Sequence, residues 1–213
     1  PLPSSSVTAL SLLDHMATVW LQPDLDMMDL GSDSPFHGTP AAKLHAAIWM
    51  MMRSPLMFAG KLPADEQTLN LVANPLALDI NSHAGPLQVS YQGDCSCTPD
   101  PQQSQFACRP INAVGAEPCV AVWWAAMPLS SCRALAVLNI GNTTADGVRV
   151  QLAQLQLPSQ LKGSLNVTNI YDQTSKAVSS SGSIEMRVAG QGAELLLVSA
   201  GPAEECAAPS SHA

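Results

Sequence analysis

The feature that most constrains the fold of this chain is a change of pattern near residue 86. Before that point, helical periodicities alternate with short apolar runs, which is typical of an α/β unit with parallel strands. After it come only short alternating or β-branched runs, separated by Gly, Asn, Pro and Ser. We therefore predict an α/β part at residues 1–85 and an all-β domain at residues 86–201. Residues 202–213, mostly Ala, Pro, Ser and Glu, are expected to form a disordered tail.

The α/β part contains one clear helix start and one clear helix stop. Thr39-Pro40 supplies a hydroxyl N-cap followed by proline at the first helical position, and Ser54-Pro55 ends the helix. Asp65 and Glu66 favour a later helix, because carboxylates in a first turn complement the helix dipole. The predicted elements, in order, are helix 4–19, strand 17–22, a polar loop at 24–38, helix 39–53, strand 56–60 and helix 63–74.

The all-β part is predicted to be an antiparallel β-sandwich. Turn signals such as Asn139-Ile-Gly-Asn142 separate the apolar runs, and seven short strands at this spacing are typical of a sandwich. The expected strands are 87–91, 119–126, 135–140, 148–157, 164–171, 183–188 and 194–199. We expect the sandwich to fold by itself and the first 85 residues to be unstable alone.

Charge and hydropathy exclude two classes of partner. The formal net charge is −8 with only nine Lys and Arg residues, whereas nucleic-acid binding needs clustered basic side chains. No apolar run reaches the roughly 18 residues of a membrane span. Residues 44–59 come nearest, but Arg53 and Pro55 interrupt them. A surface with so few charges suits a neutral ligand such as a sugar.

Cysteines and sequons favour the secretory pathway. Five of the six cysteines lie between residues 95 and 132, and the Cys95-Ser-Cys97 spacing is too short for a zinc knuckle. We predict disulfides, without a pairing, and expect no metal and no cofactor. Asn142-Thr-Thr and Asn166-Val-Thr are N-glycosylation sequons, so glycosylation is predicted at Asn142 and Asn166. The protein is expected to be secreted, either vacuolar or lysosomal, or extracellular.

The candidate chemistry lies in residues 20–29, where Asp24, Asp26 and Asp29 follow the predicted strand 17–22. The carboxyl ends of strands form the active-site face of α/β barrels. Residues two apart on an extended chain point to one side, roughly 6.5–7 Å apart at Cα. Such a pair can bind sugar hydroxyls, hold a metal, or share acid–base work. In a purely structural alternative, one carboxylate caps a turn and the other is solvated.

Several motifs in residues 20–83 resemble the α-galactosidases and raffinose synthases, glycoside hydrolase families 27 and 36. Gln22-Pro-Asp-Leu-Asp-Met27 is similar to the Gln-Pro-Asp-Trp-Asp-Met motif of the raffinose-synthase branch, and a small-residue helix with His45 follows. The family 27 branch matches Ile48-Trp-Met-Met-Met-Arg-Ser-Pro-Leu56, Thr68-Leu-Asn-Leu-Val-Ala-Asn74 and Leu78-Asp-Ile-Asn81, and Leu135-Ala-Val-Leu-Asn139 resembles a strand of its C-terminal domain. The resemblance implies the last strands and helices of a (β/α)8 TIM barrel followed by an antiparallel β-sandwich.

The resemblance also implies a function. It predicts the C-terminal portion of a retaining glycosidase that hydrolyses terminal α-galactosides, with a galactose-containing oligosaccharide or glycoconjugate as partner. The family's nucleophile and acid/base precede the matched motifs, so this chain contains no catalytic residue. Asp26 is expected to contact galactose hydroxyls, with Met27 beside the sugar and Asp24 orienting the loop. Trp20 is either a stacking residue or, as more often in strands, part of the core.

Some residues are interpreted as structural, and one departs from the family pattern. We interpret His45 as structural and Met50, Met51 and Met52 as packing residues. Gly60-Lys61 stands where the family usually has an acidic residue, which bears on substrate preference. The alternative function is a non-catalytic carbohydrate-binding or structural β-sandwich attached to a decayed barrel.

Overall fold

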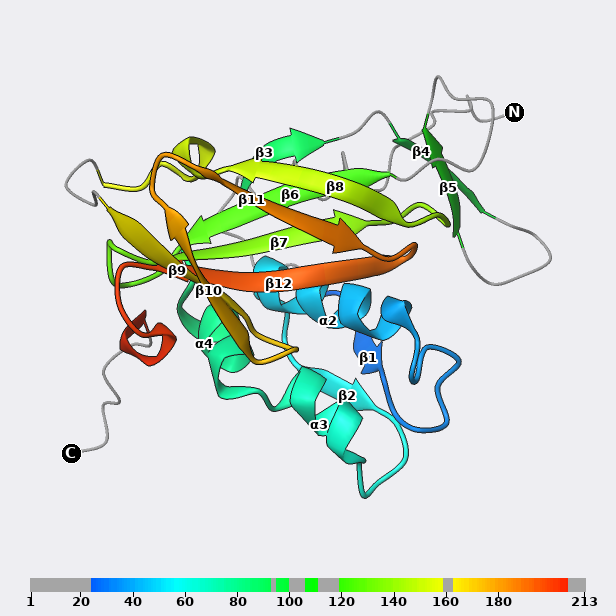
Figure 1. Ribbon diagram of the computed structural model, residues 1–213. Helices are drawn as coiled ribbons and strands as arrows, with labels where there is room; N and C mark the ends of the chain where they lie inside the picture. The colour runs from blue at the N-terminus through cyan, green and yellow to red at the C-terminus, as the bar shows by residue number, and fades with distance from the viewer. Residues whose placement is uncertain (1–23, 93–94, 100–105, 111–118, 159–162, 207–213) are drawn as a thin grey trace, which may run out of the picture.

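The computed structural model describes residues 24–92, 95–99, 106–110, 119–158 and 163–206. The predicted helix 4–19, the predicted strand 17–22 and Trp20 lie outside these residues. The centre of the structure is a six-stranded antiparallel sheet, drawn across the middle of Figure 1. Its strands, in spatial order, are β10 (Thr174–Ser179), β9 (Ser164–Asn169), β12 (Gly192–Ser199), β7 (Arg133–Asn139), β6 (Val120–Ala126) and β3 (Gln88–Gln92).

The central strands of this sheet are buried on both faces. All seven residues of β7 are buried, as are most of those in β6 and β12. Since successive side chains of a strand point to opposite faces, the sheet contributes to two cores. Leu135, Val137 and Leu196 belong to one core, whereas their neighbours Ala136 and Leu195 belong to the other.

Helix α2 (Pro40–Met52) covers one face of the sheet and packs against β12, β7 and β6. In Figure 1 it lies directly beneath β12. The sheet residues on this face include four alanines of β6 and β7, whose small side chains let the helix approach closely: Ala121, Ala125, Ala134 and Ala136. The helix begins after Thr39, as predicted, and ends at Arg53, whose backbone is left-handed (φ 57°). The predicted hydroxyl cap is absent, because the Thr39 hydroxyl donates to the Phe36 carbonyl instead.

A two-stranded antiparallel ribbon covers the opposite face. It consists of β8 (Ala145–Gln151) and β11 (Ser183–Val188), and a 3-10 turn at Leu152–Leu155 follows β8. Val150, Leu152, Ile184 and Val188 from these elements pack onto the sheet. Two antiparallel layers with an apolar core between them form a β-sandwich, which confirms the sandwich expected for the second part of the chain.

The α/β part contains one short parallel pair, β1 (Met27–Asp29) and β2 (Met57–Ala59). Strand β2 confirms the predicted strand 56–60, but β1 falls within residues 24–38, which we had predicted to be loop throughout. Instead of one helix at 63–74 there are two, α3 (Glu66–Val72) and α4 (Pro75–His83). The side chain of Asn74 caps α4 by accepting from the backbone N–H groups of Leu76 and Ala77, which separates the two helices.

The second part differs from the prediction in its short and polar elements. Strand β10 and the hairpin formed by β4 (Cys95–Pro99) and β5 (Phe106–Pro110) were not predicted. The tail is ordered further than expected, because residues 203–206 form a 3-10 turn in which Cys206 is buried and disulfide-bonded to Cys132. Cys119 is disulfide-bonded as well, so disulfides are present as expected. None of the described helices is long and apolar enough to cross a bilayer.

The fully buried side chain of Asn139, at the end of β7, joins two turns of the sandwich and the residue that precedes β6. Its Oδ1 accepts from the backbone N–H groups of Cys119 and Gly141, and its Nδ2 donates to three carbonyls, including that of Val188. An amide is the side chain that supplies both donors and acceptors at one point. This residue therefore closes the β7–β8 and β11–β12 ends of the sandwich together.

Replacing Asn139 with alanine is expected to lower the free energy of unfolding by about 3–5 kcal/mol, because buried N–H and C=O groups lose their partners. Urea unfolding of protein made without glycosylation measures the loss. Asn142→Ala, at an exposed position of the same turn, is the control and should stay within about 0.5 kcal/mol of the parent. Equal stabilities of the two variants would contradict this role for Asn139.

Candidate functional site

The candidate site is the turn that leads into β1. The backbone of Asp26 is left-handed (φ 68°), and its N–H donates to Oδ1 of Asp24 at 2.9 Å. This is an Asx-type turn, in which an aspartate side chain replaces a backbone acceptor. The chain between Asp24 and Asp26 is therefore not extended, and the argument that placed both carboxylates on one side of a strand is wrong. Asp24 holds the turn, and Asp26 follows it with an exposed side chain.

The same turn is tied to the core by a hydroxyl. The Leu25 N–H donates to Oγ of Ser54 at 2.9 Å, and Ser54 is fully buried just past the end of α2. Asn81 of α4 donates from Nδ2 to the carbonyls of Ser54 (2.9 Å) and Trp49 (3.1 Å). The position of the Asp26 turn thus depends on α2 and α4. Ser54 and Asn81 lie in motifs that resemble family 27, but neither was predicted to support the turn.

Beyond the turn, β1 and β2 run side by side in parallel. Met27 and Met57 are register partners and remain 56% and 41% exposed. A Cβ built on Gly31 would come within 2.5 Å of the Gly60 Cα, so the chain segments after the two strands approach too closely for any side chain. The Asp33 carboxylate then accepts from the Lys61 N–H at 3.0 Å. Gly60-Lys61, the departure from the family pattern, is therefore part of a backbone contact.

The histidine of α2 lies in an aromatic row. The His45 ring is 4.3 Å from that of Phe36 and 5.8 Å from that of Trp49, measured between centroids. Burial lowers the pKa of His45, and the Asp29 carboxylate opposes that shift only in part. A neutral ring between two aromatic rings agrees with a structural role. Met50, Met51 and Met52 are buried in the core beneath the sheet.

The described part of the chain contains no candidate metal-binding site. No group of three or more His, Cys, Asp or Glu side chains is arranged there to hold a metal ion. Within the same residues, the Asp26 carboxylate makes no hydrogen bond or ion pair, so both of its oxygens are available to a ligand. The turn can therefore offer a fixed, exposed carboxylate beside an exposed methionine.

The two sequons differ in their surroundings. Asn142 is exposed in the turn between β7 and β8, and its Oδ1 accepts from Gln191. Asn166 lies half-buried within β9, where its Nδ2 donates to the Gly201 carbonyl at 3.1 Å. The sequon hydroxyl of Thr168 is buried and bonded to Ser175. Only Asn142 presents a free side-chain nitrogen at the surface of the folded chain.

Comparison with known proteins finds sequence and structural relatives, although no protein-family model matches. A probable α-galactosidase B of Emericella nidulans is 32% identical over 90 residues, which cover 39% of this chain and 20% of that protein. A family 27 β-L-arabinopyranosidase of Geobacillus stearothermophilus superposes with a TM-score of 0.59 at 19% identity, covering 90% of this chain and 38% of the enzyme. An α-galactosidase of Saccharomyces cerevisiae gives 0.60 at 11% identity, covering 82% and 46%.

The structural matches cover more of this chain than the sequence match does. At such low identities the structural likeness establishes the shared fold alone. The chain spans about a fifth of the curated relative and less than half of each of these enzymes.

Replacing Ser54 with alanine is expected to release the Asp26 turn, because the Leu25 N–H then has no acceptor. Amide hydrogen exchange at Leu25 should accelerate at least about tenfold, equivalent to losing one hydrogen bond of about 1.4 kcal/mol. Ser32→Ala, at an exposed position after β1, is the matched control. Unchanged protection of Leu25 in Ser54→Ala would show that the turn is held by something else.

Protein secreted from a glycosylating host is expected to carry a glycan at Asn142 and none at Asn166. A glycan on Asn166 would disturb the bond to Gly201 and the packing around Thr168, so chains modified there should fold poorly. Peptide mass spectrometry before and after endoglycosidase treatment measures the occupancy of each site. High occupancy at Asn166 in folded, secreted protein would refute this distinction.

Proposed function

We propose that this chain, a relative of the α-galactosidases of glycoside hydrolase family 27, forms the C-terminal part of an enzyme that hydrolyses terminal α-galactosides with retention of configuration. The observation that carries the proposal is the Asp24–Met27 turn. It places a motif that resembles the family's sugar-contacting segment at the start of a parallel strand, with its backbone anchored to the core.

Asp26 is proposed to bind the sugar rather than to react with it. A carboxylate that is bonded to no protein group has both oxygens free to accept hydrogen bonds from neighbouring hydroxyls, and such charge-assisted bonds are the stronger kind. The Asx turn and the Leu25–Ser54 bond hold its backbone, so less entropy is lost when a ligand is bound. Met27 offers an apolar surface beside it.

The nucleophile and the acid/base are proposed to lie in polypeptide that precedes residue 1. The pair β1–β2, linked through α2, is a parallel β–α–β unit, the repeating unit of a TIM barrel. Within the described residues, β1 pairs only with β2, and the exposed Met27 and Met57 lie across that pair. Further barrel strands would cover this edge and bring the catalytic aspartates to the same face. This chain alone is then expected to be inactive.

The proposed setting is the secretory pathway, with the protein either vacuolar, lysosomal or extracellular. The Cys132–Cys206 disulfide and the exposed sequon at Asn142 support it, since disulfides persist in oxidising compartments. The proposed substrate is a galactose-containing oligosaccharide or glycoconjugate. Among the structural neighbours, the Saccharomyces cerevisiae α-galactosidase has been crystallised with raffinose.

In the complete enzyme, Asp26→Asn is expected to lower kcat/KM for an α-galactoside by about 10- to 100-fold. This decrease corresponds to the loss of one charge-assisted hydrogen bond. Asp24→Asn is the matched control. It keeps the side-chain oxygen that accepts from the Asp26 N–H, so the turn and most of the activity should survive. The assay is hydrolysis of p-nitrophenyl α-galactoside.

Two outcomes would contradict the proposal. Unchanged kcat/KM in Asp26→Asn would remove Asp26 from the sugar site. A complete protein that binds galactosides without hydrolysing them would point instead to the non-catalytic alternative.

A further inference from the structure

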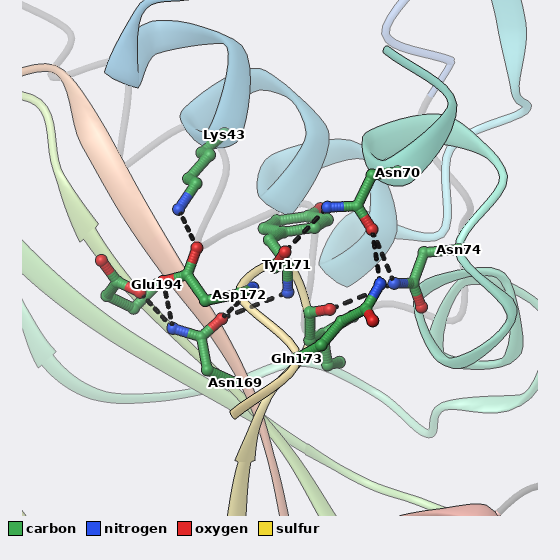
Figure 2. Close-up of polar contacts among 9 residues, drawn as sticks. Lys43, Asn70, Asn74, Asn169, Tyr171, Asp172, Gln173 and Glu194 are labelled. Carbon is green, nitrogen blue, oxygen red and sulfur yellow. Dashed lines mark hydrogen bonds and ion pairs between the residues drawn. The ribbon is translucent and has the colours of Figure 1, made fainter. Parts of the chain in front are cut away.

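A polar cavity lies between the helical layer and the sandwich, away from the Asp26 turn. Its volume is about 350 Å³, and its walls come from the start of α2, from α3, from the turn between β9 and β10, and from the start of β12. The polar residues that line it are Thr39, Lys43, Gln67, Asn70, Tyr171, Asp172 and Glu194. None of its lining residues belongs to β1 or to the turn before it. Figure 2 shows most of these side chains converging from α2, α3, the β9–β10 turn and β12.

The walls of this cavity are held by a network of hydrogen bonds. Lys43 Nζ contacts Asp172 Oδ1 at 2.5 Å, and Asn169 Nδ2 donates to Glu194 at 2.5 Å and to Asp172 at 3.1 Å. Asn70 Nδ2 donates to the Tyr171 carbonyl at 2.7 Å. Residues more than 100 positions apart are thereby fixed against one another (Figure 2). A site whose groups are held in advance loses little entropy when it binds a ligand.

Several groups on these walls have hydrogen-bonding capacity left over. The Glu194 carboxylate lines the cavity and accepts one hydrogen bond, from Asn169 Nδ2. Among the described residues, the Gln67 amide makes no side-chain bond, and Lys43 uses one of its three protons. The Tyr171 hydroxyl also lacks a partner there, but it is fully enclosed, so a ligand in the cavity does not contact it.

An open groove continues from the cavity along α3. Its volume is about 800 Å³, and it shares Gln67 and Asn70 with the cavity. Asn74, Gln173 and the carboxylates Asp65 and Glu66 also line it. The Asn70 and Asn74 amides are bonded to protein groups, whereas Gln67 and Gln173 keep amide groups that can donate to and accept from hydroxyls.

The charges around the cavity select the class of ligand. Two carboxylates, Asp172 and Glu194, disfavour an anion, and Lys43 disfavours a simple cation. An apolar ligand would cover polar groups without satisfying them, which is costly. A neutral ligand with many hydroxyls satisfies carboxylate, ammonium and amide groups together.

We infer that this cavity and the adjoining groove bind a neutral oligosaccharide, with one sugar unit in the cavity and the next along α3. This site is separate from the Asp26 turn, and it does not depend on the enzyme activity proposed above. The boundary between the helical layer and the sandwich thus serves to bind a glycan.

The test is a titration of the ¹⁵N-labelled chain with raffinose, a neutral trisaccharide, followed by amide chemical shifts. Shifts are expected at residues 67–74, 171–173 and 194. The double variant Gln67→Ala/Glu194→Gln should weaken binding at least about tenfold, since the first change removes one ligand contact of about 1 kcal/mol and the second weakens a charge-assisted one. The Gln67 side chain makes no hydrogen bond within the described residues, and Glu194→Gln keeps an oxygen that accepts from Asn169. The fold should therefore persist, and the circular dichroism melt checks this.

The controls separate this inference from the proposed function. Asp26→Asn should leave the shifts at the cavity unchanged, whereas loss of all binding in that variant would assign the sugar to the Asp26 turn and overturn the inference. The inference would also be overturned if the cavity residues showed no shifts at raffinose concentrations that saturate another site. Equal binding of raffinose by the double variant and the parent would overturn it as well. Inorganic phosphate should not bind there. If it does and raffinose does not, the ligand class is wrong.

Discussion

The structure depends on the burial of one sheet from both sides. Strands β6, β7 and β12 place alanines and leucines against α2 on one face and branched aliphatic residues against β8 and β11 on the other. Burying apolar surface contributes roughly 25 cal/mol per Å², so removing the helical layer would uncover a complete core face. We expected the sandwich to fold by itself. The shared core argues instead that the sandwich and helix α2 stabilise each other.

This shared core also positions the candidate site. Helix α2 packs on the sheet, its C-terminal end presents Ser54, and Ser54 holds the turn that carries Asp26. Asn81 links the same point to α4, and Asn70 and Asn74 link α3 and α4 to the β9–β10 turn through backbone carbonyls. The exposed carboxylate of Asp26 is thus supported by contacts that reach the far strands of the sandwich. These bonds join the α/β part of the chain to the sandwich at several points.

The parts predicted well from sequence are those with a strong local signal. The Thr39-Pro40 and Ser54-Pro55 motifs predicted the two ends of α2, although the Thr39 hydroxyl makes no cap bond. Alternation predicted most central strands. Strand β1 was missed because three residues carry no period, and β10 because its side chains are almost all exposed. The Asx turn reversed the expected geometry of Asp24 and Asp26. The cavity network was beyond reach, because Lys43 and Asp172 are 129 positions apart and no local pattern joins them.

Native-state hydrogen exchange would test the shared core most directly. The account predicts that amides in the middle of α2, such as those of Ala46 and Met50, exchange with the same free energy as amides of β7 and β12, because all of them open only when the whole core unfolds. Their protection should also fall together as denaturant is added. If α2 exchanges through a low-energy opening while β7 and β12 stay protected, the sandwich is stable without its helical cover and the account is contradicted.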